Sequence, residues 1–107
     1  MKTAELTGAL LDYWVARAEN KNAFMYEGVC FTGPMPGVGI EYKPSERWGQ
    51  CGPLIEKWKV ELDRSGTGWY ADIWACGGAL GDTPLQAICR AVVRAAFGDE
   101  VEEVAVC

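Results

Sequence analysis

Hydrophobic positions recur at helical spacing near the start of the chain. Leu6, Leu10, Tyr13 and Trp14 are three or four residues apart, and Ala9 and Ala18 continue the same stripe. This pattern predicts a helix from about Ala4 to Ala18, with Thr3 as its cap. On that helix Asp12, Arg17 and Glu19 fall on the polar side.

A second helical pattern lies near the C-terminus. Thr83 is suited to cap the helix, Pro84 to occupy its first position and Gln86 to complete a capping box. Gly98 is a natural stop after Phe97. The predicted buried face consists of Leu85, Ile88, Cys89, Val92, Val93 and Ala96.

Between these helices the pattern changes to the alternation of strands. Apolar and polar residues alternate over residues 57–62 and again over 69–75, with a glycine-containing turn at 63–68, which predicts an antiparallel hairpin. A further strand is expected over 23–32. The four prolines and five glycines between Gly33 and Pro53 predict a loop, interrupted by a short strand near Val38 to Tyr42. Glycine-rich residues 77–81 predict a flexible connection.

These elements predict an α+β fold in which two helices pack on a small antiparallel β-sheet, in the order helix, strands, helix. A chain of 107 residues has the size of one domain, so residues 1–107 are expected to form a single α+β domain. An acidic tail, from about residue 99 to 107, ends it.

The net charge of −5 is concentrated in that tail. Asp99, Glu100, Glu102 and Glu103 contribute −4, so the remaining ten basic and eleven acidic residues sum to only −1. Such a balance argues against non-specific nucleic-acid binding. One hypothesis is that the tail competes for nucleic-acid-binding surfaces of other proteins. Because no apolar run approaches a membrane span and the start does not resemble a signal peptide, we expect a cytoplasmic protein, in the cytosol of a host cell.

The chain contains no histidine, which removes the commonest general base and metal ligand. Its five cysteines are widely spaced, without a Cys-x-x-Cys pair, so free thiols are expected, with Cys30 and Cys89 buried and Cys107 exposed. We therefore expect no cofactor and no metal site, and assign no catalytic residue. Arg17, Arg90 and Arg94 either form an anion-binding patch or lie on solvated helix faces.

The segment from Tyr42 to Pro53 is the most informative one, because it places aromatic, amide and cationic side chains among backbone-shaping residues. One interpretation makes it a recognition loop. The other makes Trp48 a lid folded onto the core. The candidate binding residues are Tyr42, Ser45, Arg47, Trp48 and Gln50.

Three segments resemble the NinX-type proteins of tailed phages and prophages. They are KTAELTGALLDYWVA at residues 2–16, the loop Y-x-P-S-x-x-W at 42–48 with GPLIE at 52–56, and TPLQAICR at 83–90 followed by GDEVE at 98–102. The resemblance covers nearly the whole chain. It implies a small accessory protein of temperate phages, in a family of unknown function, and supplies no catalytic residues.

The excess of aromatic residues without catalytic chemistry favours a non-enzymatic accessory protein. We expect it to act by binding an unidentified protein partner, as a homo-oligomer, through the Tyr42 to Pro53 loop and neighbouring aromatic residues. The alternative is a small enzyme or small-molecule binder with a pocket under this loop. In that case the site uses either Cys51 as the nucleophile, with its thiol pKa lowered by the neighbouring Arg47, or a carboxylate.

Overall fold

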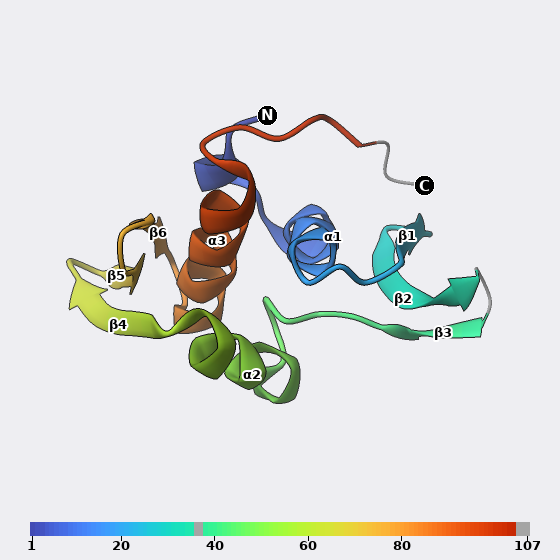
Figure 1. Ribbon diagram of the computed structural model, residues 1–107, viewed down its shortest axis with the longest axis horizontal. Coiled ribbons are helices and arrows are strands. Elements are labelled where there is room, and N and C mark those ends of the chain that lie inside the picture. Colours follow the sequence, from blue (N-terminus) through green and yellow to red (C-terminus); the bar gives the residue numbers. More distant parts are fainter. Residues whose placement is uncertain (36–37, 105–107) are drawn as a thin grey trace.

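The computed structural model describes residues 1–35 and 38–104. Within them it contains three α-helices, one short 3-10 turn and two three-stranded antiparallel sheets. The two sheets lie at opposite ends of the molecule, and α1 and α3 lie between them (Figure 1). The α+β class is confirmed, whereas the expected pair of helices on one sheet is too simple.

The first predicted helix is interrupted near its start. A 3-10 turn at Thr3–Glu5 is separated by extended residues from α1, which covers Gly8–Ala18. Thr3 does not cap a helix: it is buried, and its hydroxyl donates a hydrogen bond to the Gly98 carbonyl at 2.8 Å. The N-terminus is thereby tied to the end of the last helix.

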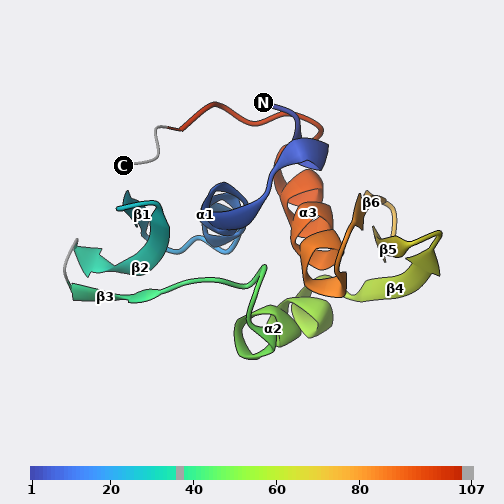
Figure 2. The ribbon, with the colours of Figure 1, turned by 180° about the vertical axis from the view of Figure 1, so that it is seen from behind.

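The acidic tail begins as part of this connection. The Met1 amino group donates to the Val101 carbonyl, and the Val101 N–H donates back to the Met1 carbonyl, both at 2.9 Å. Figure 2 shows the tail running from the end of α3 past the N-terminus. Of the predicted acidic tail, Asp99–Val101 is therefore paired, while Glu102 and Glu103 are exposed. The prediction for Cys107 falls outside the described residues.

The buried face of α1 differs from the predicted stripe. Leu11, Val15 and Ala16 are fully buried, together with Asp12, which the pattern placed on the polar side. The reason is that α1 contacts both α3 and the first sheet, so more than one of its faces is covered.

The first sheet has the strand order β1-β2-β3, with β1 at Ala23–Tyr26, β2 at Val29–Met35 and β3 at Val38–Glu41. The single strand expected over 23–32 is thus a hairpin. Its turn uses Glu27 and Gly28, both with positive φ, which suits the twist of paired strands. The short strand near Val38 to Tyr42 is confirmed as β3.

The third helix, α2 at Trp48–Trp58, contradicts the predicted loop and the predicted start of a strand at Lys57. Pro53 lies inside it, although an internal proline destabilises a helix by about 3 kcal/mol. Burial compensates for this loss. Cys51 and Leu54 are fully buried, and Ile55 and Trp58 pack beside them, so the apolar residues follow helical spacing.

The second sheet has the order β4-β5-β6. Strands β4 at Val60–Ser65 and β5 at Gly68–Ile73 form the predicted hairpin, while residues 77–81, expected to be a flexible connection, form β6 at Gly77–Gly81. Glycine is required at position 81, because a Cβ there would lie 2.4 Å from the Ala87 nitrogen. The close approach of β6 to the final helix explains the glycine.

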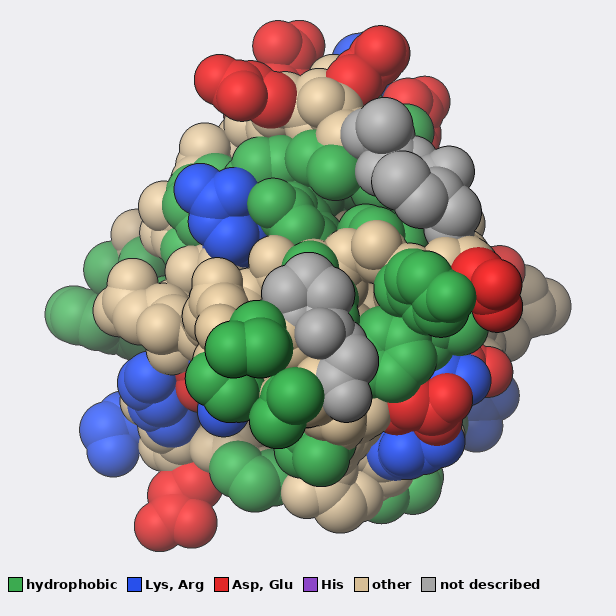
Figure 3. All heavy atoms as spheres, turned by 90° about the vertical axis from the view of Figure 1, so that its right-hand side faces the viewer, with side chains coloured by type: hydrophobic (Ala, Val, Ile, Leu, Met, Phe, Trp, Pro, Cys, Tyr) green, Lys and Arg blue, Asp and Glu red, His purple; other side chains and the backbone are tan. Residues whose placement is uncertain are grey.

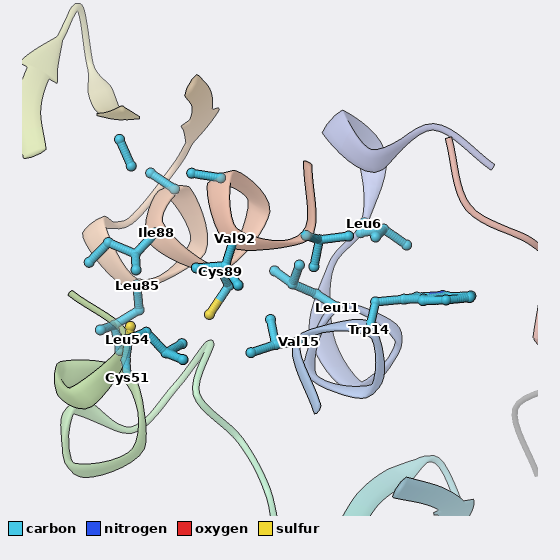
Figure 4. Close-up of a cluster of buried hydrophobic side chains, with 14 of the residues drawn as sticks. Leu6, Leu11, Trp14, Val15, Cys51, Leu54, Leu85, Ile88, Cys89 and Val92 are labelled. Carbon is cyan, nitrogen blue, oxygen red and sulfur yellow. The ribbon is translucent and has the colours of Figure 1, made fainter. Parts of the chain in front are cut away.

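The final helix, α3 at Pro84–Phe97, is confirmed with its caps. The Gln86 N–H donates to the Thr83 hydroxyl, and the Gln86 side chain accepts from the Asp82 N–H. Ala96 is exposed, and Ala91 lies on the buried face instead. Side chains of α1, α2 and α3 converge in one core (Figure 4), to which α3 contributes Leu85, Ile88, Cys89 and Val92.

Candidate interaction surface

The start of the Tyr42 to Pro53 segment is anchored by a buried carboxylate. The Ser45 N–H donates to Asp12 Oδ1 at 2.9 Å, and Asp12 is only 1% exposed. Burial raises the pKa of Asp12 to about 6, because the charged form loses its hydration, and the hydrogen bond from Ser45 opposes this rise. Ser45 is therefore positioned by its backbone and acts as an attachment point for the loop.

Gln50 holds the same segment from the other side. Its Oε1 accepts from the Lys43 N–H at 2.6 Å, and its Nε2 donates to the Glu41 carbonyl at 2.9 Å. Tyr42 is 5% exposed and belongs to the core; burial raises the pKa of its hydroxyl. Of the five predicted binding residues, Tyr42, Ser45 and Gln50 thus shape the segment.

Arg47 and Trp48 are the two predicted binding residues that face solvent. Trp48 is 55% exposed, so it does not form a lid on the core. Arg47 Nη2 lies 2.7 Å from Glu41 Oε1 at the end of β3, which joins the corner between the loop and α2 to the first sheet.

A shallow hollow connects this corner with β3. It has a volume of about 260 Å³, and Ile40 of β3 lines it together with Gly49 and Pro53 of α2. Lys21 and Tyr42 also line it, with the Lys21 ammonium 5.6 Å from the centroid of the Tyr42 ring. The loop and β3 therefore belong to one surface.

Large apolar side chains are exposed on this surface. Met35, Val38 and Ile40 are 56%, 57% and 66% exposed, values close to that of Trp48. We call these four residues the β3 strip. Figure 3 views this end of the molecule, where hydrophobic side chains gather over the middle and acidic ones at the top. Met35, Val38 and Ile40 were not predicted as binding residues, because apolar residues between glycines and prolines in the sequence were interpreted only as parts of a loop or a short strand.

The buried thiols of Cys30, Cys51 and Cys89 do not reach this surface. Cys51 and Cys89 are fully buried. The pKa of the Cys51 thiol is lowered because the Cys89 thiol donates a hydrogen bond to it, so the predicted effect of Arg47 is wrong as to its cause. Burial raises the pKa of Cys30 to about 12. In residues 1–35 and 38–104, no group of three or more Cys, Asp or Glu side chains is arranged to hold a metal ion.

The three arginines that could have formed an anion-binding patch, Arg17, Arg90 and Arg94, do not lie together. Arg17 lies against the ring of Trp14, 5.4 Å from its centroid, whereas Arg90 and Arg94 are on α3 beside β6. Arg90 donates to the Leu80 carbonyl and Arg94 to the Gly78 carbonyl, each at 2.9 Å. These two arginines bind the outer edge of β6.

None of the helices described is long and apolar enough to cross a lipid bilayer.

Comparison with known families supports the resemblance in the segments at residues 2–16, 42–56 and 83–90. A comparison with curated proteins finds no match. The family model described as "Bacteriophage P22, NinX" matches residues 2–95, from the start of the chain to the last turn of α3. Because this match includes the helices, both sheets and the surface around Trp48, the chain belongs to the NinX family of phage proteins.

Proposed function

We propose that this phage protein is a non-enzymatic accessory protein that acts in the host cytoplasm by binding another protein, and that it forms a homo-oligomer. The observation that carries the proposal is the β3 strip: Met35, Val38, Ile40 and Trp48 are all more than half exposed. Met35 is paired with Val38 in the sheet, and Ile40 lines the same hollow as Gly49, the neighbour of Trp48. Large exposed apolar groups that gather in one place are typical of interaction sites.

The residues at the corner of this surface suit protein recognition. Tryptophan and arginine are enriched among the residues that dominate binding free energies at protein interfaces. Trp48 and Arg47 are adjacent, and the segment that carries them is held by Asp12 and Gln50. A preorganised segment loses little conformational entropy when it binds.

The alternative of a small enzyme or small-molecule binder is less well supported. The hollow beside the loop has about 260 Å³, below the roughly 300–1,000 Å³ of typical ligand pockets. Cys51, the candidate nucleophile, is fully buried on the core side of α2. A substrate in the hollow would not reach its sulfur without movement of the helix.

The proposal is tested by affinity capture from phage-infected cells. Trp48→Ala should abolish capture of a partner that the wild-type chain retains. Trp74→Ala is the matched control, because Trp74 is 84% exposed and follows β5 at the other end of the molecule.

Both variants should unfold within about 0.5 kcal/mol of wild type, as expected for exposed side chains. Capture that is unaffected by Trp48→Ala, or lost equally with Trp74→Ala, contradicts the proposed surface.

A further inference from the structure

The outer edge of β3 differs from the other sheet edges. The β6 edge is covered by Arg90 and Arg94, and β4 carries the charged residues Glu61, Asp63 and Arg64. Covering side chains and charged residues both protect an edge strand from pairing with another chain. On β1, three of the four side chains are half-buried. By contrast, β3 has no charged residue from Val38 to Ile40, and all three residues are exposed.

The hydrogen-bonding pattern shows which backbone groups of β3 face outward. The Tyr42 N–H donates to the Cys30 carbonyl of β2 at 2.9 Å. Because successive residues of a strand direct their N–H and C=O groups to opposite sides, Ile40 faces β2, while Glu41 and Gly39 face away. The Glu41 carbonyl accepts a hydrogen bond from Gln50 Nε2 and not from β2, as this assignment requires. Gly39 therefore presents both its N–H and its C=O at the open edge.

We propose that two copies of this chain pair through β3. The strands run antiparallel about a two-fold axis at Gly39, so that the two Gly39 residues exchange N–H···O=C hydrogen bonds and the two first sheets become one six-stranded sheet. This inference rests on the proposed function, because it assigns an occupant to the β3 strip. It names that occupant as a second copy.

The side chains on β3 fit this register. Val38 of each copy lies opposite Ile40 of the other, so the exposed apolar groups cover one another in pairs. The partner strand also brings its Val38 end toward the corner formed by Arg47 and Trp48, because it runs in the opposite direction. Gly39 at the centre adds no side chain that would hinder the approach.

The charges are compatible with the pairing as well. The two Glu41 residues would lie four strand positions apart, or roughly 14 Å. This exceeds the distance of about 8 Å over which exposed charges interact at physiological salt. Each Glu41 also keeps its own ion pair with Arg47. A two-fold axis requires a surface that complements itself, and the uncharged part of β3 from Val38 to Ile40 meets that requirement.

The first experiment measures mass by light scattering during size-exclusion chromatography, over a range of concentrations. The wild-type chain should reach the mass of a dimer. Ile40→Lys should weaken the dimer at least tenfold, because it places a cation opposite Val38 of the partner copy. Leu80→Lys is the matched control: Leu80 is 58% exposed on β6, whose edge is already covered, and this variant should dimerise like wild type.

The second experiment tests the register by disulfide cross-linking with oxidised glutathione, which takes up the two electrons and two protons released by the thiols. Exposed Cys76 and the terminal Cys107 are first replaced by serine. A mixture of Val38→Cys and Ile40→Cys chains should form a cross-linked dimer, because opposite residues in such a pair have Cα atoms about 4.5–5.5 Å apart. Neither variant alone should form a cross-linked dimer, because its two cysteines would be diagonal neighbours across the paired strands, about 7–8 Å apart.

A wild-type chain that remains monomeric at millimolar concentration overturns the dimer, as does equal cross-linking in all three samples. Growth beyond a dimer would also overturn it, since a two-fold pairing is closed. A monomer that still loses its captured partner with Trp48→Ala would overturn the dimer and leave the proposed binding of another protein standing.

Discussion

The two sheets of this protein have the same number of strands and the same antiparallel order, yet they differ in what they bury. The second sheet packs against α3, with Ala71, Ile73 and Gly81 buried beneath the helix. The first sheet buries Cys30 against the helices and leaves Val38 and Ile40 in solvent. One sheet therefore completes the core, and the other displays a surface.

Their edges show the same contrast. The second sheet is protected by arginines that bind β6 and by charged residues on β4. The outer strand of the first sheet lacks such protection from Val38 to Ile40. An unprotected apolar edge favours aggregation unless another chain covers it, so the difference indicates where this protein meets a partner.

The largest effect on stability should come from truncating an isoleucine that is buried in the core. Ile88→Ala, at a fully buried position of α3, should lower the free energy of unfolding by about 2–5 kcal/mol, because it removes packed methyl groups and leaves a cavity. Ile40→Ala makes the same chemical change on the first sheet. In the monomer it should alter the free energy of unfolding by less than about 0.5 kcal/mol. Urea denaturation of dilute protein measures both. Similar losses would show that Ile40 is part of the core.

The next effect concerns Asp12, where the core meets the loop. Its pKa is raised from 3.8 to about 6, so the folded state binds this proton more tightly than the unfolded state does. Its contribution to stability is therefore fully favourable below pH 3.8 and is lost as the pH rises to about 6, a change of about 3 kcal/mol.

Asp12→Asn keeps an oxygen that can accept the Ser45 N–H but removes the charge. The variant should be more stable than wild type at pH 7.5, by up to about 3 kcal/mol, and the difference should shrink toward pH 4. Denaturation across this range measures it. A difference that does not change with pH would mean that the Asp12 pKa is not raised.

A smaller effect is expected at Gln50, which supports the corner of the exposed surface. Gln50→Ala removes hydrogen bonds to the Lys43 N–H and the Glu41 carbonyl and should destabilise the fold by about 1–2 kcal/mol. The Lys43 amide should exchange its hydrogen markedly faster, while amides in α3 change only with global stability. Gln86→Ala is a control, because its side chain also accepts a backbone N–H, at the start of α3. Unchanged protection at Lys43 would contradict the role of Gln50.

The accuracy of the sequence-based predictions varied along the chain for physical reasons. Helix α3 was predicted with its caps, because Thr83, Pro84 and Gly98 act locally. Helix α2 was missed, because Pro53 and its neighbouring glycines oppose a helix that only burial stabilises. The sequence feature that indicates this helix is the helical spacing of the apolar residues Cys51, Leu54, Ile55 and Trp58.

The candidate site was predicted in part for a similar reason. The segment around Arg47 and Trp48 was identified from its composition, and these two residues do face solvent. Tyr42, Ser45 and Gln50 were assigned to binding, but their contacts are internal. Val38 and Ile40 were assigned to a strand without any indication that they would be exposed.

The sequence by itself determined the α+β class, the hairpin of β4 and β5 and the position of α3, because local spacing, turns and caps specify these features. It also determined the family, through the resemblance of whole segments and the match over residues 2–95. Only the tertiary structure decided which faces are covered. It buried Asp12 beneath the loop, made a helix through Pro53 and left β3 open to solvent. Whether a residue is exposed depends on which distant elements pack against it, and hydrophobic spacing along the chain does not specify those neighbours.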